Sequence, residues 1–369
     1  MTWTYWTVYS VRVKVRDRRA TRRLLFTSKM TFNKDTNNRE AGDVNSRVKQ
    51  EANGGLWDSI TKAAFIMGSG ILLLAAFGNS LTWHLQRFWG ASGDFWQDLW
   101  TRLYLRYEGH PASLFYLGTM LAPLVAFWAT NGLLLLVDVT GWPSFITRYR
   151  VQADKNSPVD QGKLWHAIRH VVFNQLMVSG PMVVGIYYLT SWRGDPLNAQ
   201  LPTFHRGLME LAVCSLVEEL MFYYSHRLFH HPTLYKHFHK QHHEWTAPIG
   251  LVSIYAHPLE HVLSNMLPAV SGPVLLGSHL STTSLWYCLA FISTSISHCG
   301  YHLPFLPSPE FHDYHHLKFN QNFGVLGVLD RLHGTDSKFR QTKQYERHAL
   351  LTSFTPLTES IPDAPKKLQ

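Results

Sequence analysis

Long apolar stretches that carry no charge constrain the fold of this chain more than any other feature. The longest runs from Ser113 to Val137 without one charged side chain. An uncharged apolar stretch of about 20 residues is typical of a helix that crosses a membrane. Six stretches fit this description, although the fourth contains Glu210, Glu218 and Glu219. They are residues 63–81, 113–137, 171–189, 207–224, 262–277 and 282–297.

The last two stretches form either two full spans or one re-entrant hairpin, and the sequence leaves both possibilities open. We therefore predict an all-α protein, an integral membrane helical bundle of four to six membrane helices with a helical cap on the cytosolic side. Either arrangement places both termini on the same side of the membrane. Basic residues indicate that this side is the cytosol, because loops rich in Lys and Arg are found mainly on the cytosolic side of a membrane. The loop 138–170 contributes Arg148, Arg150, Lys155, Lys163 and Arg169, and the N-terminal tail is also basic.

Histidine is the unusual residue of this sequence, with 22 copies. Two HxxxH motifs follow directly on predicted membrane helices, and an HxxHH motif comes shortly after each. Spacings of three and four residues place side chains on one face of a helix, so each motif presents two or three imidazoles together. The ten histidines are His226, His230, His239, His242, His243, His298, His302, His312, His315 and His316.

Ten clustered imidazoles indicate a metal centre. They are enough to enclose two metal ions with five nitrogens each, and neutral imidazole suits iron, zinc, copper and nickel. A structural zinc needs four ligands, and three scattered cysteines cannot form a cysteine-based zinc site. All four motifs are predicted on the cytosolic side. We expect structural roles for the histidines outside the motifs, namely His231, His237, His261 and His279, whereas His257 could position a ligand or gate the site.

Flanking residues carry a family resemblance. The segments EELMFYYSHRLFHHPTLYKHFHKQHHEWTAP at 218–248 and FHDYHHLKFNQNFGVLGVLDRLHGTD at 311–336 resemble the fatty acid hydroxylase/sterol desaturase superfamily of membrane di-iron enzymes. The second segment looks most like the C4-methylsterol oxidase branch. The resemblance implies that the ten histidines are the catalytic metal ligands and that they hold two iron ions, with zinc possible in overexpressed protein. One departure is Glu218-Glu219, where many relatives have Glu-Asp.

Carboxylates near the motifs are candidates to hold the ligand histidines, because such histidines usually donate their second ring N–H to a carboxylate or carbonyl. A carboxylate inside a membrane helix costs roughly 2.5–3.5 kcal/mol, which favours a functional role over simple exposure at the interface for at least one of Glu218 and Glu219. With His257, the candidates are Glu218, Glu219, Glu244, Glu260, Asp313, Asp330 and Asp336.

Four regions follow from these patterns. Residues 1–55 form a basic, largely disordered tail, 56–206 carry membrane helices, 207–336 form the fatty acid hydroxylase-type catalytic domain, and 337–369 form a C-terminal cytosolic tail. The first thirty residues also fit a mitochondrial transit peptide. The net charge of +9 lies largely in the first thirty residues, and no nucleic-acid-binding motif accompanies them. We therefore expect no nucleic-acid partner. The final Lys366-Lys367-Leu368-Gln369 matches a dilysine signal for the endoplasmic reticulum.

The predicted function is O₂-dependent oxidation of a membrane lipid, with C4-methylsterol oxidation in sterol biosynthesis as the first hypothesis. Hydroxylation or desaturation of fatty acyl chains or sphingolipids is the alternative, and a non-catalytic membrane scaffold on the same fold is a further one. Oxidation of a C–H bond needs two electrons, and the sequence shows neither a dinucleotide-binding motif nor a haem-binding segment. The resemblance suggests cytochrome b5 and an NAD(P)H-linked reductase as electron donors.

Overall fold

The computed structural model describes residues 90–194 and 197–363, together with isolated positions between 61 and 88 that are all helical. The chain divides into two compact units, residues 1–88 and 89–369. The predicted N-terminal tail and the dilysine end lie outside the described residues, and the predicted span 63–81 is described only in part. Everything below concerns the second unit.

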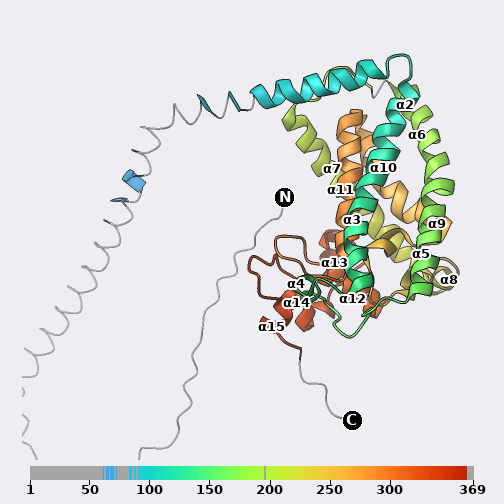
Figure 1. The fold of residues 1–369 in the computed structure, drawn as a ribbon, viewed down its shortest axis with the longest axis vertical. Coiled ribbons are helices and arrows are strands. Elements are labelled where there is room, and N and C mark those ends of the chain that lie inside the picture. Colours follow the sequence, from blue (N-terminus) through green and yellow to red (C-terminus); the bar gives the residue numbers. More distant parts are fainter. Residues whose placement is uncertain are drawn as a thin grey trace, which may run out of the picture. The chain divides into compact units, whose positions relative to one another are not determined.

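The second unit is built from helices, which confirms the all-α prediction (Figure 1). Within residues 90–194 and 197–363 the only β pairing is one isolated bridge between Arg150 and Tyr301. Residues 90–106 are helical. The α-helices that follow are α2 (Pro111–Tyr116), α3 (Ala122–Thr140), α4 (Ser144–Thr147), α5 (Gln161–Phe173), α6 (Gly180–Arg193), α7 (Phe204–Phe229), α8 (Pro232–Leu234), α9 (Pro258–Glu260), α10 (Leu267–Leu276), α11 (Leu280–His298), α12 (Glu310–Lys318), α13 (Val328–His333), α14 (Lys343–Arg347) and α15 (Leu357–Ser360).

Short π-helical and 3₁₀ turns join several of these helices. The π-helical turns η1 (Leu117–Leu121), η2 (Asn174–Ser179) and η6 (His261–Met266) connect α2 to α3, α5 to α6 and α9 to α10, so each pair forms one long helix. The remaining turns are η3 (Tyr235–His239), η4 (His242–Glu244), η5 (Gly250–Ile254) and η7 (Phe339–Gln341).

Two of the long helices are long and apolar enough to cross a membrane, judged by length and composition within the described residues. They are Pro111–Thr140, of 30 residues, and Gln161–Arg193, of 33 residues, and they contain the predicted spans 113–137 and 171–189. Helix α7 covers the predicted span 207–224. The helices 258–276 and α11 cover the last two predicted stretches.

Close approaches between helices hold the bundle together. A Cβ atom added at Gly272 of α10 would lie 2.8 Å from Cys214 Sγ of α7, so these helices pack at a glycine. Asn131 of α3 donates a 2.9 Å hydrogen bond to Ser295 of α11. Small residues and hydrogen bonds between helices are the usual contacts of membrane bundles, where burial of apolar surface drives little association. Leucines such as Leu133, which is 72% exposed, cover the outside.

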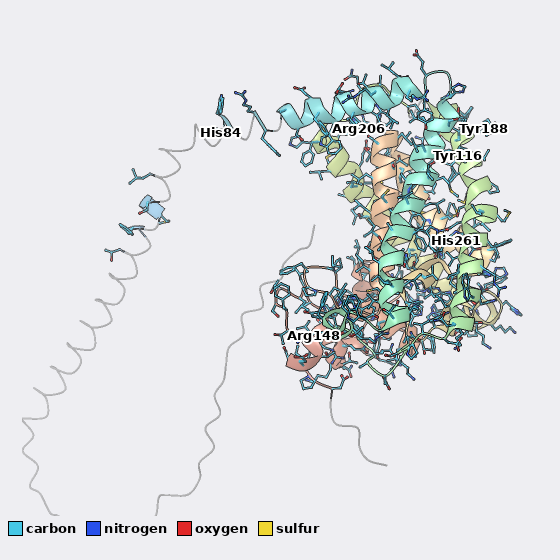
Figure 2. The ribbon with its side chains drawn as sticks, viewed as in Figure 1. His84, Tyr116, Arg148, Tyr188, Arg206 and His261 are labelled. Carbon is cyan, nitrogen blue, oxygen red and sulfur yellow. The ribbon has the colours of Figure 1, made fainter. Side chains whose placement is uncertain are left out.

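The two ends of the bundle differ. At one end the helix 90–106 lies across the bundle (Figure 1), fixed by hydrogen bonds from Trp100 to Asn198 and from Gln97 to Ala199. At the other end lie α4 and α12 to α15. Figure 2 shows Arg206 and Tyr188 near the first end and Arg148 at the second. Helices α7 and α11 both terminate at the second end, where the histidine motifs begin.

The C-terminal segment 337–363, predicted as a tail, packs against this second end. Phe339, Arg347 and Leu351 are almost completely buried. Arg347 forms a buried ion pair with Glu310 of α12 at 3.3 Å. The segment is therefore part of the cap that covers the histidine-bearing helix α12.

Candidate metal centre

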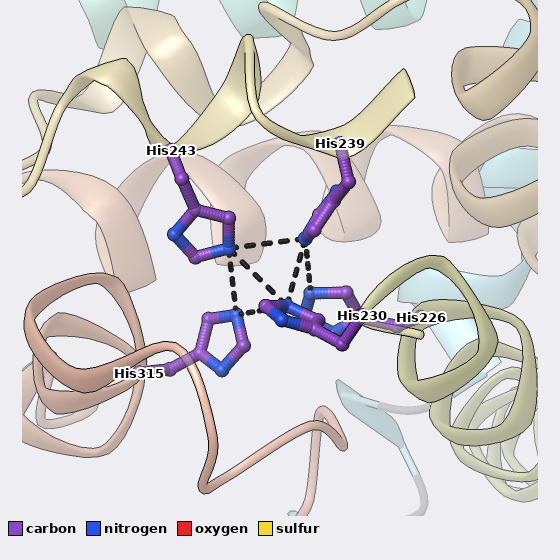
Figure 3. Close-up of side chains that lie close together, drawn as sticks. All are labelled: His226, His230, His239, His243 and His315. Carbon is purple, nitrogen blue, oxygen red and sulfur yellow. Dashed lines mark hydrogen bonds between the residues drawn. The ribbon is translucent and has the colours of Figure 1, made fainter. Parts of the chain in front are cut away.

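Nine of the ten predicted histidines gather into two groups of ligand atoms that each lie within 4.8 Å of one another. Group 1, drawn in Figure 3, contains His226, His230, His239, His243 and His315. Group 2 contains His242, His298, His312 and His316. Eight of the nine side chains are buried, and His230 is half-buried. Two adjacent clusters of imidazole nitrogens therefore lie under the cap.

The two HxxHH motifs exchange their middle histidines. His239 and His243 belong to group 1, while His242 between them belongs to group 2. The second motif does the reverse, because its middle residue, His315, joins group 1. On a helix with 3.6 residues per turn, positions i and i+4 lie about 40° apart, whereas i+3 and i+4 lie about 100° apart. In the second motif, which lies on α12, the first and third histidines therefore share a direction and the middle one faces the other group. The first motif reaches the corresponding arrangement through the π-helical turn η3 and the 3₁₀ turn η4.

Hydrogen bonds fix the ring orientation of most of these histidines. In six of the nine, Nδ1 lies within hydrogen-bond distance of a carbonyl or carboxylate oxygen. Those pairs are His226 with Phe323 O (2.7 Å), His239 with Glu260 Oε1 (2.6 Å), His242 with Tyr255 O (3.3 Å), His298 with Thr294 O (2.8 Å), His315 with Gln321 O (2.7 Å) and His316 with Trp245 O (3.0 Å). Because Nδ1 carries the hydrogen, Nε2 is left with a free lone pair.

The Nε2 atoms converge on one another, and this tests whether the groups fit a metal. In group 1, Nε2 of His226 lies 3.2 Å from Nε2 of His239, and Nε2 of His243 lies 3.1 Å from Nε2 of His315 (Figure 3). In His226 and His239 both Nδ1 atoms carry the hydrogen, so their Nε2 atoms are two acceptors that repel at such a distance unless a cation lies between them. Nitrogens bound to one ion at roughly 2.1 Å, at right angles, would be about 3 Å apart. The residues present therefore fit a bound metal ion.

Group 2 gives the same result. Nε2 of His312 lies 2.8 Å from Nε2 of His298. Nε2 of His316 is buried and has no hydrogen-bond partner among the described residues. A buried lone pair without a donor is costly, and a metal ion would satisfy it.

The histidines outside the membrane helices are held neutral, as metal ligation requires. Burial lowers the pKa of His242 to about 4. Burial also lowers the pKa of His312 and His316 well below the usual value, and electrostatic repulsion from neighbouring histidine rings lowers it further. These imidazoles therefore offer lone pairs at neutral pH.

The structure does not bring His302 into either group. Its Nε2 donates to the carbonyl oxygen of Ala349 at 2.9 Å, and its Nδ1 lies 3.7 Å from Glu310. Helix α11 ends at His298, and Gly300 follows with φ +71°. Because the chain leaves the helix, the i, i+4 spacing no longer places the two side chains on one face. In the first motif the backbone stays helical through His230, so His226 and His230 remain together.

Comparisons with known proteins agree with this centre. The family described as Fatty acid hydroxylase matches residues 211–335. The "Fatty acid hydroxylase domain-containing protein 2" of Macaca fascicularis is 62% identical over 330 residues, which are 89% of this chain and 99% of that protein. This chain belongs to the fatty acid hydroxylase family. The resemblance seen in the motifs is thereby confirmed.

More distant members of the fatty acid hydroxylase family match part of the chain. "Fatty acid hydroxylase ahd1" of Mycosarcoma maydis is 36% identical over 242 residues, 65% of this chain and 61% of that protein. "Methylsterol monooxygenase 1" of Gallus gallus is 31% identical over 213 residues, 55% of this chain and 71% of that protein. The methylsterol branch, which the motifs favoured, is thus more distant than the macaque relative. No solved structure matches the chain.

Two of the predicted carboxylates hold a loop that contacts group 1. Glu219 accepts hydrogen bonds from the backbone N–H groups of Val325, Leu326 and Leu329 at 2.7–2.9 Å. Asp330 accepts from those of Phe323 and Gly324 at 2.8 and 2.6 Å. Together they position the Phe323 carbonyl that receives the hydrogen of His226.

The other predicted partners lie further from the imidazoles. Glu260 alone among the carboxylates contacts a histidine of either group directly, within the described residues. Glu244 accepts from Tyr255, whose own carbonyl holds His242. Asp313 accepts hydrogen bonds from Gln152 and Gln344, and Asp336 forms ion pairs with Arg331 and Arg340. Glu218 is half-buried on α7. His257 caps α9 by accepting a hydrogen bond from the N–H of Leu259.

The partners that sequence reasoning missed are backbone carbonyls. Five of the six Nδ1 hydrogens go to main-chain oxygens, such as those of Thr294 and Trp245. A carbonyl has no residue type, so no sequence signal could reveal it. Among the histidines outside the motifs, His261 bonds Ser179 across two helices and His279 caps α11.

Proposed function

We propose that this chain oxidises a membrane lipid with O₂ at a dinuclear iron centre held by groups 1 and 2. The observation that carries the proposal is that the nine largely buried histidines of groups 1 and 2 direct their Nε2 atoms toward one another within each group. They lie at the end of the bundle where α7 and α11 terminate. A lipid substrate can reach such a centre from the bilayer, and a soluble donor can approach the cap.

A 4-methylated sterol is the substrate class that we propose first. The methylsterol monooxygenases of the family support it, as does the sequence FHDYHHLKFNQNFG at 311–324. Oxidation of a fatty acyl or sphingoid chain is the second candidate, supported by the fungal fatty acid hydroxylase. The match to that protein covers a larger share of this chain.

Each part of the chain contributes differently to the reaction. Bound iron would supply the activation of dioxygen. Group 1 offers five nitrogens and group 2 offers four, so the two ions would differ in coordination. The carbonyls of Phe323 and Gln321 and the carboxylate of Glu260 hold Nδ1–H hydrogens and keep the imidazoles neutral and aimed. Burial of the rings excludes water from the centre.

We further propose an endoplasmic reticulum location with both termini and the metal centre in the cytosol. The helices 258–276 and α11 are each about 28 Å long at 1.5 Å per residue, close to a hydrocarbon thickness of about 30 Å. This length favours two full spans over a re-entrant hairpin. Electrons would come from cytochrome b5 and an NAD(P)H-linked reductase.

Complementation of a cell that lacks C4-methylsterol oxidase tests the proposal. Wild-type protein should remove the accumulated 4-methylsterols, and His315→Ala should not, because it removes a group 1 nitrogen. His231→Ala is the matched control, since the exposed His231 lies outside both groups and its ring bonds Thr233, two residues away. Equal rescue by His315→Ala would show that the centre is not catalytic. Failure of the wild type, with altered hydroxyacyl lipids instead, would favour the second candidate.

A further inference from the structure

An exposed apolar surface adjoins group 1. It consists of two parts, the apolar loop, by which we mean the turn 324–327 with residues 328–332 of the short helix α13, and the α7 stripe of Leu216, Leu220, Tyr224 and Leu228. In the loop, Val325, Leu326, Val328 and Leu332 are exposed, and Leu332 is 74% exposed. Arg331 is the exposed charged residue of this segment, and it pairs with the buried Asp336 at 3.0 Å. Each residue of the stripe is about half exposed.

The loop and the stripe form one continuous surface. Leu326 N–H donates to Glu219 at 2.7 Å, and Glu219 precedes Leu220 of the stripe. Tyr224 bonds His333, the residue after the loop, at 3.0 Å. Glu219 lies seven residues before His226, or about 10 Å along the helix axis. The loop therefore runs beside α7 within the depth of its predicted span rather than beyond its end.

Five backbone N–H groups in and beside the apolar loop are satisfied inside the protein. Glu219 and Asp330, which are 3% and 0% exposed, accept hydrogen bonds from five backbone N–H groups of residues 323–329. A loop in water has no need of two buried carboxylates for this purpose, because water bonds its amides. A turn and the first turn of a helix have that need at membrane depth, because their amides lack partners within the segment and hydrocarbon offers none. This pairing explains a carboxylate in the middle of α7 despite its cost.

The loop also leads directly to the metal centre. Phe323 precedes it, and its carbonyl receives the hydrogen of His226 Nδ1 at 2.7 Å. The Phe323 ring lies 5.1 Å from the His230 ring and 5.7 Å from the His315 ring. Val325 comes two residues later, so at most about 7 Å of backbone separates a lipid-exposed side chain from residues packed on group 1.

We propose that the apolar loop is inserted in the hydrocarbon of the leaflet next to the histidines, where it forms the lipid-facing wall along which the substrate approaches group 1. The occupant is bilayer lipid, because the surface continues the lipid-facing stripe of a membrane helix. Two buried carboxylates, Glu219 of α7 and Asp330 of α13, also accept hydrogen bonds from amides of this segment, for which hydrocarbon offers no partner. The substrate part of this inference rests on the proposed function, whereas the insertion does not.

Fluorescence quenching of full-length protein in lipid nanodiscs tests the insertion. Leu326→Cys and Leu332→Cys are labelled in a Cys288→Ser background, since Cys214 and Cys299 are buried. Lipids brominated on their acyl chains should quench both labels, and aqueous iodide should not. Phe354→Cys is the control, because Phe354 is 72% exposed on the C-terminal segment of the cap, and its label should respond to iodide.

Two results would overturn the insertion. Iodide quenching at 326 and 332 as strong as at 354 would place the loop in water. Labels that are protected from both quenchers in discs with two chains, but quenched in discs with one chain, would show that a second copy covers this surface.

A kinetic measurement tests the approach route. Leu326→Asp should raise the KM for a 4-methylsterol in nanodiscs about tenfold, the loss expected for one apolar contact of about 1.4 kcal/mol. Its kcat and metal content should remain those of the wild type. The control Phe354→Asp should leave the KM and the kcat unchanged. An unchanged KM for Leu326→Asp would overturn the route. Wild-type protein inactive on sterols and acyl lipids alike would instead remove the proposed function, while the quenching would still decide the insertion.

Discussion

Glu260 and His239 form the shortest contact between a carboxylate and a candidate ligand in the described chain, 2.6 Å, and both are almost completely buried. Removal of such a partner typically costs 10–100-fold in metal affinity. We expect Glu260→Ala to lose iron to a chelator roughly that much more readily than wild type. Glu260→Gln should lose less, because its amide oxygen still accepts the Nδ1 hydrogen.

Iron per chain after timed chelator exposure, measured by plasma mass spectrometry, gives the comparison. Glu359→Gln is the matched control, since Glu359 pairs with Arg148 on the surface. Wild-type retention of iron by Glu260→Ala would show that His239 is held by its neighbours alone.

Gly324 illustrates a residue whose size matters. A Cβ atom at this position would lie 2.9 Å from Asp330 Oδ2 and 2.9 Å from Glu219 Oε1. We expect Gly324→Ala to lower the stability by about 1–3 kcal/mol, the usual cost of overpacking. Gly132→Ala on α3, where nothing lies within 4 Å, should be neutral or slightly stabilising. Thermal unfolding in detergent compares the two variants, and equal midpoints would mean that the carboxylates move apart freely.

At the scale of elements, α12 connects the metal centre to the C-terminal segment. One face carries His312, His315 and His316, and the other carries Glu310 and Asp313, which bond Arg347 and Gln344. Glu310 and Asp313 are almost completely buried, and this burial raises the pKa of Asp313 to about 7. The segment 337–363 therefore holds α12 from behind.

His302 belongs to this outer layer, which yields a prediction about the second HxxxH motif. We expect His302→Ala to keep its bound metal, because the ring lies outside both groups. It should lose about 0.5–1.5 kcal/mol of stability, since the hydrogen bond from the buried His302 ring to the carbonyl of the exposed Ala349 is lost. Metal analysis and thermal unfolding separate these effects. His298→Ala, which removes a group 2 nitrogen, is the comparison, and loss of metal by His302→Ala alone would return His302 to the ligand set.

The contrast between the two HxxxH motifs shows what the sequence can predict. Histidine spacing correctly indicated that imidazoles gather, because α7 and α12 are helical where the spacing assumes it. It could not show that α11 ends at His298, since neither Cys299 nor Gly300 forbids a further turn in a membrane helix. The exchange of His242 and His315 also depends on tertiary packing. The carbonyl partners of the rings carry no residue signature at all.

At the scale of the whole molecule, the two ends of the bundle predict its orientation. The end with the histidines carries many cations, among them Arg148, Lys155, Lys163, Lys236, Lys240, Lys318, Lys338 and Lys343. Basic residues concentrate on the cytosolic side of membrane proteins. The opposite end, with the helix 90–106 and the turn at Gly109, should then face the lumen.

Glycosylation mapping tests this orientation in cells. An Asn-X-Thr acceptor engineered at the exposed turn 108–110 should be glycosylated, because the lumen holds the transferase. An acceptor in the exposed part of the loop 152–157 and tags at residue 40 and at the C-terminus should remain unmodified and accessible from the cytosol. The turn is a better site than the helix before it, where Trp100 is buried against Asn198. A glycosylated acceptor at 152–157 would place groups 1 and 2 in the lumen, beyond the reach of a cytosolic electron donor, and would contradict the proposed reaction together with the orientation.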